Sequence, residues 1–253
     1  MTKIVASNLS LHVGDAHLVD DASFTLSQGE LVVLLGPNGA GKTSLIRAAL
    51  GLQFPSSGSA TLDDVETLNL SPSQRARKIA YLPQLRPLAW PNQVRDIVSL
   101  GRFSHGAVLG KLTGSDARAV DQAIAACDLE RLAHRSTDSL SGGELARVHC
   151  ARAFATEAPL LVADEPTAAL DPRHQFRILD LIQSYVQSGG GALLVLHDIE
   201  LAARYATRLI WMKDGKVVAD GPPSASLTVE RLSDVYGIAA RIENGHIIME
   251  GAL

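Results

Sequence analysis

Residues 36–43 read Gly-Pro-Asn-Gly-Ala-Gly-Lys-Thr and follow directly on an apolar run from Leu31 to Leu35. The pattern G-x-x-x-x-G-K-[ST] behind a buried strand is typical of a phosphate-binding loop. In such a loop the backbone N–H groups turn toward the nucleotide phosphates, the lysine reaches the outer two phosphates, and the threonine hydroxyl is a magnesium ligand. The stretch therefore predicts that Lys42 and Thr43 bind a nucleotide together with Mg²⁺.

A second glycine-rich stretch, Leu140-Ser141-Gly142-Gly143-Glu144, lies further along the chain. By itself Ser-x-x-Glu is an ordinary capping box, in which Ser141 accepts a hydrogen bond from the Glu144 amide and the Glu144 side chain accepts one from the Ser141 amide. A capped helix start with two glycines also presents bare N–H groups and a positive dipole end to an anion. The two interpretations are compatible.

Composition narrows the class of protein. The chain has 253 residues, of which 46% are hydrophobic, and a net charge of −4. This length allows one large α/β domain or a core with a subdomain, and the absence of excess positive charge gives no support for a nucleic-acid partner. No apolar run approaches the ~20 residues that span a bilayer, so we expect a soluble protein. Cys127 and Cys150 lack metal-ligand spacing and are expected to be reduced, mostly buried thiols of a cytoplasmic protein.

Apolar runs and helical patterns alternate along most of the chain. We expect strands at 4–11, 22–26, 31–35, 58–62, 79–82, 159–163 and 192–196, and turns at 14–15 and 28–29. Helices are expected from 42 to 50, from about 71, and from 172 to about 187 behind the N-cap Asp171. Residues 83–150 read as a helical subdomain, with an apolar stripe formed by Ala119, Ile124, Ala125, Leu129 and Leu132. Continuous apolar strands between helices predict a parallel sheet covered on both faces, with function at its carboxyl ends.

Polar residues follow four of these strands. Strand 31–35 leads into the phosphate loop, strand 79–82 into Gln84, strand 159–163 into Asp164 and Glu165, and strand 192–196 into His197. Taken singly, Gln84 has the alternative interpretation of a turn residue and His197 that of a satisfied loop histidine. Their joint occurrence at strand ends favours nucleotide chemistry, because a lysine, a metal and a water-orienting carboxylate form a sufficient set for phosphoryl transfer.

Together these motifs resemble the ATP-binding cassette (ABC) ATPases, whose signature is Leu-Ser-Gly-Gly-Gln, over nearly the whole chain. The resemblance implies an α/β fold: a P-loop NTPase core with a mostly parallel sheet, an N-terminal antiparallel β subdomain and an inserted helical subdomain. The whole chain would be one nucleotide-binding domain. Its core would comprise residues 1–84 and 151–222, the helical subdomain with the signature 85–150, and a C-terminal extension 223–253.

The resemblance also implies roles for individual residues, with ATP and Mg²⁺ as cofactors. Asp164 is similar to the aspartate that holds hydrated magnesium and Glu165 to the catalytic glutamate that orients or deprotonates the attacking water. His197 resembles the switch histidine at the γ-phosphate, and Gln84 the glutamine that links that phosphate and its water to the membrane partner. The implied catalytic residues are Lys42, Gln84, Glu165 and His197, and the implied metal ligands are Thr43, Gln84 and Asp164.

The implied nucleotide contacts come from both glycine-rich stretches, because the resemblance also implies a head-to-tail homodimer. In that dimer the signature caps the γ-phosphate bound by the other subunit, and Asp171 crosses to that subunit. The implied contacts are Gly36, Pro37, Asn38, Gly39, Ala40, Gly41, Lys42, Thr43, Ser44, Val13, Ser141, Gly142, Gly143 and Asp171.

Two positions depart from the family pattern. Val13 stands where the family usually carries an aromatic residue that stacks on adenine. We therefore expect only aliphatic contact from Val13 or partial stacking from His12, and weak discrimination between ATP and GTP. Glu144 replaces the signature glutamine. It keeps the capping chemistry but adds a negative charge close to where phosphate would lie.

Three segments resemble importers of iron-siderophore, haem or cobalamin: Tyr81-Leu82-Pro83-Gln84, Gly101-Arg102-Phe103-Ser104-His105 and the tail from Leu227 to Gly237. For Arg102 and His105 the alternative is that both are solvated loop residues. For the apolar side chains Leu88, Trp90 and Val94 a docking surface for a membrane subunit is weighed against burial in the helical subdomain.

The resemblance implies integral membrane permease subunits as partners, and indirectly a periplasmic or surface substrate-binding protein. The chain would then lie peripherally on the cytoplasmic face of the inner (plasma) membrane. Two alternatives remain open: an ABC ATPase of another importer or exporter system, and a soluble ABC ATPase without a transport role.

Overall fold

The fold is described from a computed structural model. It covers residues 1–84, 91–108, 110–112, 114–243 and 246–253. The chain divides into two compact units: residues 1–69 with 193–253 form the first, and residues 70–192 form the second. The domain bounds inferred from the motifs, with a core at 1–84 and 151–222, stay a prediction.

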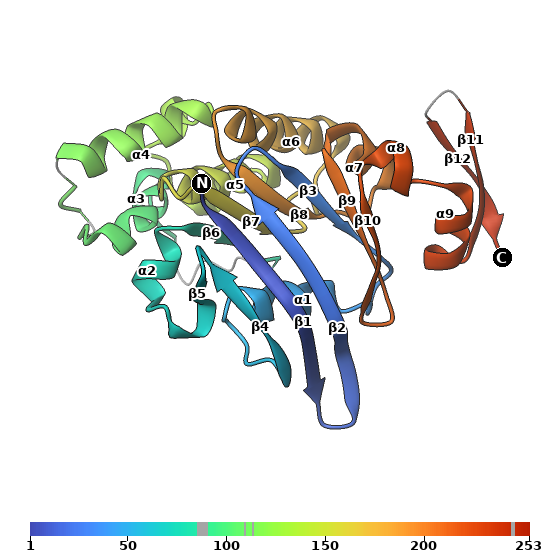
Figure 1. Ribbon diagram of the computed structural model, residues 1–253. Coiled ribbons are helices and arrows are strands. Elements are labelled where there is room, and N and C mark those ends of the chain that lie inside the picture. The colour runs from blue at the N-terminus through green and yellow to red at the C-terminus, as the bar shows by residue number, and fades with distance from the viewer. Residues whose placement is uncertain (85–90, 109, 113, 244–245) are drawn as a thin grey trace. The chain divides into compact units, whose positions relative to one another are not determined.

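An antiparallel sheet opens the first unit (Figure 1). Its order is β2-β1-β4-β5, with β1 (Lys3–Val13), β2 (Ala16–Ser27), β4 (Ser57–Leu62) and β5 (Val65–Glu66). β1 and β2 are longer than predicted because their pairing continues to Val13 and Ala16 at the turn. Gly14 makes that turn possible with a φ of +58°, a value that is strained for residues with a side chain. The N-terminal antiparallel part of the predicted fold is thereby confirmed.

The first unit also holds the strand that leads into the phosphate loop. All residues of β3 (Leu31–Leu35) are buried, and β3 runs parallel to β9 (Arg208–Lys213), with β10 (Lys216–Gly221) antiparallel at the edge. α1 (Lys42–Ala49) follows the loop and packs against β1. It ends one residue short of the predicted Leu50, just before Gly51 takes a φ of +64°.

The C-terminal residues complete this unit. Its C-terminal elements are α7 (Ile199–Tyr205), α8 (Pro223–Ser226), α9 (Val229–Tyr236), β11 (Ile238–Glu243) and β12 (His246–Ala252), and the short η1 (Thr67–Asn69) follows β5. β11 and β12 pair as an antiparallel hairpin beside α9, at the red end of the chain in Figure 1. α9 buries Leu232 and Val235 on one face.

The second unit has parallel strands of its own. β6 (Ile79–Leu82) runs parallel to β7 (Leu160–Asp164), and the boundary between the units falls within β8 (Gly191–Val195), after Ala192. α6 (Pro172–Gln187) starts where the sequence predicts, because Asp171 accepts a hydrogen bond from the His174 amide as an N-cap. The predicted mostly parallel sheet is confirmed.

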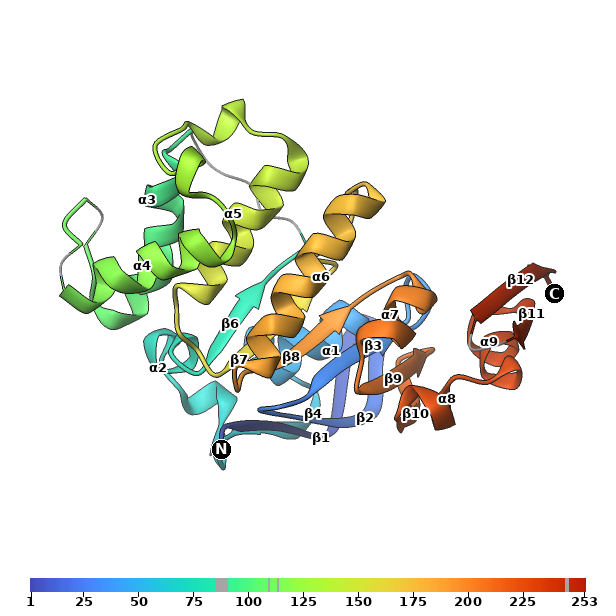
Figure 2. The ribbon, with the colours of Figure 1, turned by 90° about the horizontal axis from the view of Figure 1, so that it is seen from above.

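Helices gather in the remainder of the second unit (Figure 2). They are α2 (Pro72–Ala76), α3 (Val94–Ser99), η2 (Leu100–His105), α4 (Gly114–Ala126), η3 (Glu130–Leu132), η4 (Thr137–Ser139) and α5 (Gly142–Phe154). The predicted apolar stripe needs one correction. Ala125 is exposed, and Ala123 lies on the buried face of α4 with Ala119 and Ile124, because the helix packs along its i, i+4 line.

Arg102 is not a solvated loop residue. Only 3% of it is exposed, and its guanidinium donates to the carboxylates of Asp116 and Glu157, each at 2.8 Å, and to the carbonyl of Ala155 at 2.9 Å. A buried guanidinium needs such partners. Arg102 thus joins η2 to α4 and to the segment after α5. His105 is exposed, but its Nε2 lies 2.9 Å from the carbonyl oxygen of Thr156, so it also contacts the segment after α5.

Both cysteines are free and buried, as predicted. Burial, with a further contribution from Cys150, raises the pKa of the Cys127 thiol far above its ordinary value, so the thiol stays protonated. Among the described residues no helix combines the length and the apolar character that a membrane crossing requires.

Candidate functional site

The phosphate loop of the first unit depends on two glycines. It leaves β3 at Gly36 and closes at Gly41, with φ values of +154° and +92°. A Cβ atom at Gly36 would collide with the carbonyl oxygen of Met212, and one at Gly41 with that of Leu18. The backbones of β9 and β2 therefore pack directly against the loop. No other residue type fits at these two positions, which explains the glycine spacing of the motif.

Lys42 occupies the interior of this loop. It is 7% exposed, and its ammonium group donates to the carbonyl oxygens of Gly36 at 2.7 Å and of Pro37 at 2.9 Å. Lys42 is also the first residue of α1, so its charge adds to the positive end of the helix dipole. The loop, the lysine and the helix start together form a site for an anion such as phosphate.

Two predicted catalytic residues meet in the second unit. Asp164 ends β7 and is 1% exposed, and Glu165 follows it. Gln84, just beyond β6, donates from Nε2 to Glu165 Oε2 at 2.7 Å. Because β6 and β7 are parallel neighbours, their carboxyl ends bring these side chains together.

Glu165 adopts a backbone conformation that is rare for its residue type. Its φ is +50°, in the left-handed region, and Ala169 in the following turn has a φ of +59°. Such conformations cost about 1–3 kcal/mol each and cluster at functional sites. The segment from Glu165 to Ala169 is therefore held in place by its surroundings rather than by local preference.

The second glycine-rich stretch forms the predicted capping box. Ser141 Oγ accepts from the Glu144 amide at 3.3 Å, and Glu144 Oε2 accepts from the Ser141 amide at 2.8 Å. The Ser141 hydroxyl also donates to Glu144 Oε2 at 2.8 Å. These hydrogen bonds from Ser141 hold the pKa of the Glu144 carboxyl below its ordinary value. Glu144 is consequently charged at neutral pH.

His174 links the signature stretch to the turn before α6, and it is not among the predicted site residues. Its Nδ1 lies 2.8 Å from Asp171 Oδ2, and its ring fills the space beside Gly143, where a Cβ atom would clash with it. Hydrogen bonds from the amide and ring of His174 hold the pKa of Asp171 below its ordinary value. A histidine three residues after an aspartate N-cap was the only available signal.

His197 and Val13 both lie in the first unit and are exposed. His197 follows β8, one residue before Asp198, which caps α7 by accepting from the Leu201 amide. Val13 ends β1 and is 55% exposed, and nearby His12 and His17 have ring centroids 4.0 Å apart. An exposed valine at a strand end is open to ligand contact, and its proposed role at adenine stays a prediction.

The side chains considered for a docking surface divide into two groups. Leu88 and Trp90 lie outside the described residues. Val94 begins α3 and is fully buried, so burial in the helical part applies to Val94 and the docking interpretation of this residue is wrong.

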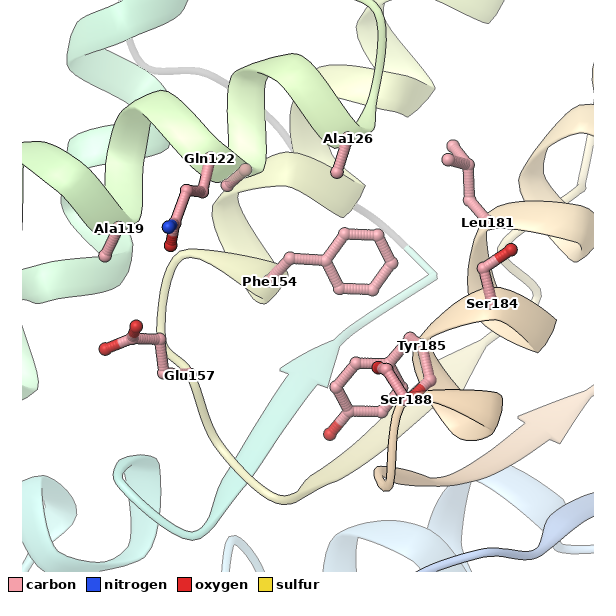
Figure 3. Close-up of a pocket in the computed structure, with 10 residues that line it drawn as sticks. Ala119, Gln122, Ala126, Phe154, Glu157, Leu181, Ser184, Tyr185 and Ser188 are labelled. Atoms are coloured by element: carbon pink, nitrogen blue, oxygen red, sulfur yellow. The ribbon is translucent and has the colours of Figure 1, made fainter.

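A pocket of about 430 Å³ lies between α4, the end of α5 and α6 (Figure 3). Its floor carries Phe154 and Tyr185, whose rings stack 5.5 Å apart. Small side chains of α4 and α6, such as Ala126 and Ser184, leave the space open. None of the site residues predicted from the motifs lines this pocket.

Comparisons with known proteins identify the family. A family model described as ABC transporter matches residues 19–168. The hemin import ATP-binding protein HmuV of Nocardia farcinica is 41% identical over 219 residues, which cover 87% of this chain and 75% of that protein. The probable siderophore transport system ATP-binding protein YusV of Bacillus subtilis is 35% identical, covering 96% and 88%.

A solved structure shows the same fold. The dimeric ATP-binding cassette MJ0796, bound to ADP and Pi in a post-hydrolysis state, is 28% identical with a TM-score of 0.74, covering 87% of this chain and 98% of that one. The glycine-rich loops, the strand-end carboxylates and these similarities lead to one assignment. The chain belongs to the ABC transporter family and is an ATP-binding cassette ATPase.

Proposed function

We propose that the chain powers the import of a metal chelate (an iron-siderophore, haem or cobalamin) through a separate membrane permease. The hydrogen bond from Gln84 to Glu165 is the observation that supports ATP hydrolysis under control of the permease. It joins the residue that would sense the permease to the residue that would orient water. The cargo class is supported by relatives named for hemin and siderophore transport, which match most of the chain.

The residues fit a magnesium nucleotide. Mg²⁺ prefers oxygen ligands, and the Thr43 hydroxyl, the Gln84 amide and the buried Asp164 carboxylate all supply oxygen. When bound, Mg²⁺ neutralises charge that develops on the transferred phosphoryl group. Lys42 would do the same at the outer phosphates with its ammonium group, which already lies within the loop. His197 would donate to the γ-phosphate.

Glu165 would accept the proton of the attacking water or orient that water. The Gln84 amide holds one of its carboxylate oxygens at 2.7 Å, which fixes the direction of the carboxylate. Positioned acid–base groups of this kind contribute about 10²–10⁴-fold to rates. Movement of Gln84 would therefore alter the orientation of Glu165, which gives the permease a route to control hydrolysis.

A homodimer would complete the site. Ser141, Gly142 and Gly143 present the N-terminus of α5, and we propose that they cap the γ-phosphate bound by the second subunit, while Asp171 crosses to that subunit. Dimeric cassettes in solved structures support this arrangement. The partners would be permease subunits and, indirectly, a substrate-binding protein, with the chain on the cytoplasmic face of the membrane. Val13 would contact adenine.

Uptake by a strain that lacks this gene tests the cargo. We expect loss of uptake of one of three labelled chelates, haem, cobalamin or a ferric siderophore, and recovery with the wild-type gene but not with Glu165→Gln. If uptake of all three is unchanged, the proposed cargo class is wrong.

Glu144→Gln is expected to strengthen the ATP-bound dimer several-fold. The amide keeps an oxygen that accepts from the Ser141 amide, so the cap survives, while a negative charge close to the phosphate is removed. Because the pKa of Glu144 is lowered, the wild-type residue stays charged down to pH values below 4.5. The gain should therefore be constant between about pH 6 and 8.

Size-exclusion chromatography at a fixed MgATP concentration measures the gain in dimer stability. The substitution is made in a Glu165→Gln background, and the fraction of dimer is compared. Glu144→Ala is the control that loses the cap as well as the charge. Thermal unfolding supplies a second check, since the cap of the charged form contributes stability above pH 4.5 that is lost as pH falls through the lowered pKa. A weaker dimer in Glu144→Gln would contradict the prediction.

A further inference from the structure

The C-terminal helix α9 contacts the phosphate loop through one side chain. Tyr236 is the last residue of α9, and its hydroxyl oxygen accepts a hydrogen bond from the backbone N–H of Gly36 at 2.9 Å. The two residues are 200 positions apart in the sequence and lie in the same compact unit. The roles inferred from motifs leave Tyr236 without a function.

The Gly36 amide needs this partner. Gly36 is buried, and a buried backbone N–H without an acceptor is costly. Gly36 also takes a φ of +154° and lies against the carbonyl oxygen of Met212. Its peptide plane is therefore confined on one side by β9, and the Tyr236 hydroxyl fixes the direction of its N–H.

The same glycine holds the phosphate-binding lysine. The carbonyl oxygen of Gly36 accepts from Lys42 Nζ at 2.7 Å. Gly36 thus lies between Tyr236 at its amide and Lys42 at its carbonyl. Any change in the Gly36 backbone torsions changes where the loop places its amides and where Lys42 can reach.

Tyr236 is itself held rigidly. Gly237 follows with a φ of +64° and ends α9, and the Tyr236 ring meets the fully buried Trp211 edge to face, with centroids 6.4 Å apart. Two residues earlier, Asp234 accepts from Lys213 Nζ at 2.9 Å, which ties α9 to β9. Burial raises the pKa of Tyr236 to about 12, so the hydroxyl is neutral near pH 7.

We propose that Tyr236 is a positioning residue for nucleotide binding: its hydroxyl fixes the Gly36 peptide and thereby the loop that holds the phosphates. The C-terminal segment is then part of the nucleotide site, because the Tyr236 hydroxyl at the end of α9 tunes the affinity for nucleoside di- and triphosphates. The inference rests on the assignment of residues 36–44 as the phosphate loop, which the proposed function shares.

Tyr236→Phe tests the inference, because it removes the hydroxyl and keeps the ring that packs on Trp211. The dissociation constant for MgADP and the KM for MgATP should both rise about fivefold, the effect of one net hydrogen bond, while kcat changes less than twofold. Hydrogen exchange of the Gly36 amide, followed by NMR in the nucleotide-free protein, should accelerate. If the role of Tyr236 were purely structural, that exchange would stay unchanged, and KM would not rise while kcat stayed nearly constant.

Two variants serve as matched controls. Tyr185→Phe also removes a half-buried tyrosine hydroxyl from a backbone partner, since Tyr185 donates to the Ala158 carbonyl at 2.6 Å, but it lies in the other unit. Asp234→Asn weakens the link between α9 and β9 without touching the loop. Both should leave nucleotide affinity within about 1.5-fold of wild type, because neither alters a partner of Gly36.

The outcomes separate this inference from the proposed function. If Lys42→Met abolishes MgADP binding while Tyr236→Phe changes neither the affinity nor the exchange of Gly36, the phosphate loop is correctly assigned and the role of Tyr236 is wrong. If Lys42→Met leaves binding intact, the loop assignment and the proposed function fail together. An affinity loss in Tyr185→Phe as large as in Tyr236→Phe would also overturn the inference.

Discussion

Glu165→Gln is expected to lower steady-state ATP hydrolysis by at least ~100-fold and to trap the subunit as an ATP-bound dimer. The substitution removes the carboxylate that would orient or deprotonate water. It keeps the side-chain shape and an oxygen that can still accept from Gln84 Nε2. Binding groups in the phosphate loop and the signature stretch are untouched, so ATP should bind and stay unhydrolysed.

Size-exclusion chromatography with saturating MgATP and a phosphate-release assay measure the two effects. Glu130→Gln is the matched control, because Glu130 is an exposed carboxylate on η3 of the same unit. It should hydrolyse ATP like wild type and show no added dimer. A Glu165→Gln protein that remains monomeric, or that keeps more than about a tenth of wild-type activity, would disprove the assigned role of Glu165.

Lys42→Met is expected to weaken MgATP binding by at least ~100-fold. The ammonium group would make charge-assisted hydrogen bonds to the outer phosphates, and two such bonds are together worth about 3 kcal/mol or more. Its loss also removes the hydrogen bonds to the carbonyl oxygens of Gly36 and Pro37, which shape the loop before nucleotide binds. The substitution should therefore both weaken MgATP binding and distort the phosphate loop.

Isothermal titration calorimetry with MgATP and MgADP measures this loss. Lys216→Met is the control in the same unit, since the ammonium group of Lys216 forms an exposed ion pair with Asp20 at 3.2 Å. Thermal unfolding without nucleotide shows whether Lys42→Met is folded. Retention of affinity within about tenfold of wild type by a folded variant would mean that another group supplies the positive charge.

Local signals in the sequence predicted the elements that carry the site. Strand 79–82, the helix behind Asp171-Pro172 and the capping box of Ser141 and Glu144 all appear with the predicted residues. Each depends on residues within a few positions of one another, such as an N-cap and the amide three residues later. Such local preferences act in the same way in many tertiary contexts, so they can be read without a structure.

The assignment of Ala125 shows where this reasoning stops. Periodicity along one helix indicates that some face is apolar, but the neighbouring helices decide which alanines that face includes. Arg102 is a second case. In the sequence, an arginine at this position is compatible with exposure to solvent. Its burial is possible because Asp116 and Glu157, from other segments, form ion pairs with its guanidinium.

The sequence by itself therefore determined the fold class, the phosphate loop and the strand-end residues, because each is encoded within a short window. The tertiary structure decided which of these residues touch. Gln84 reaches Glu165 across 81 positions because parallel β6 and β7 end side by side, and Tyr236 reaches Gly36 across 200 because α9 packs on β9. Contacts at such separations follow from strand pairing and helix packing, which no local pattern encodes.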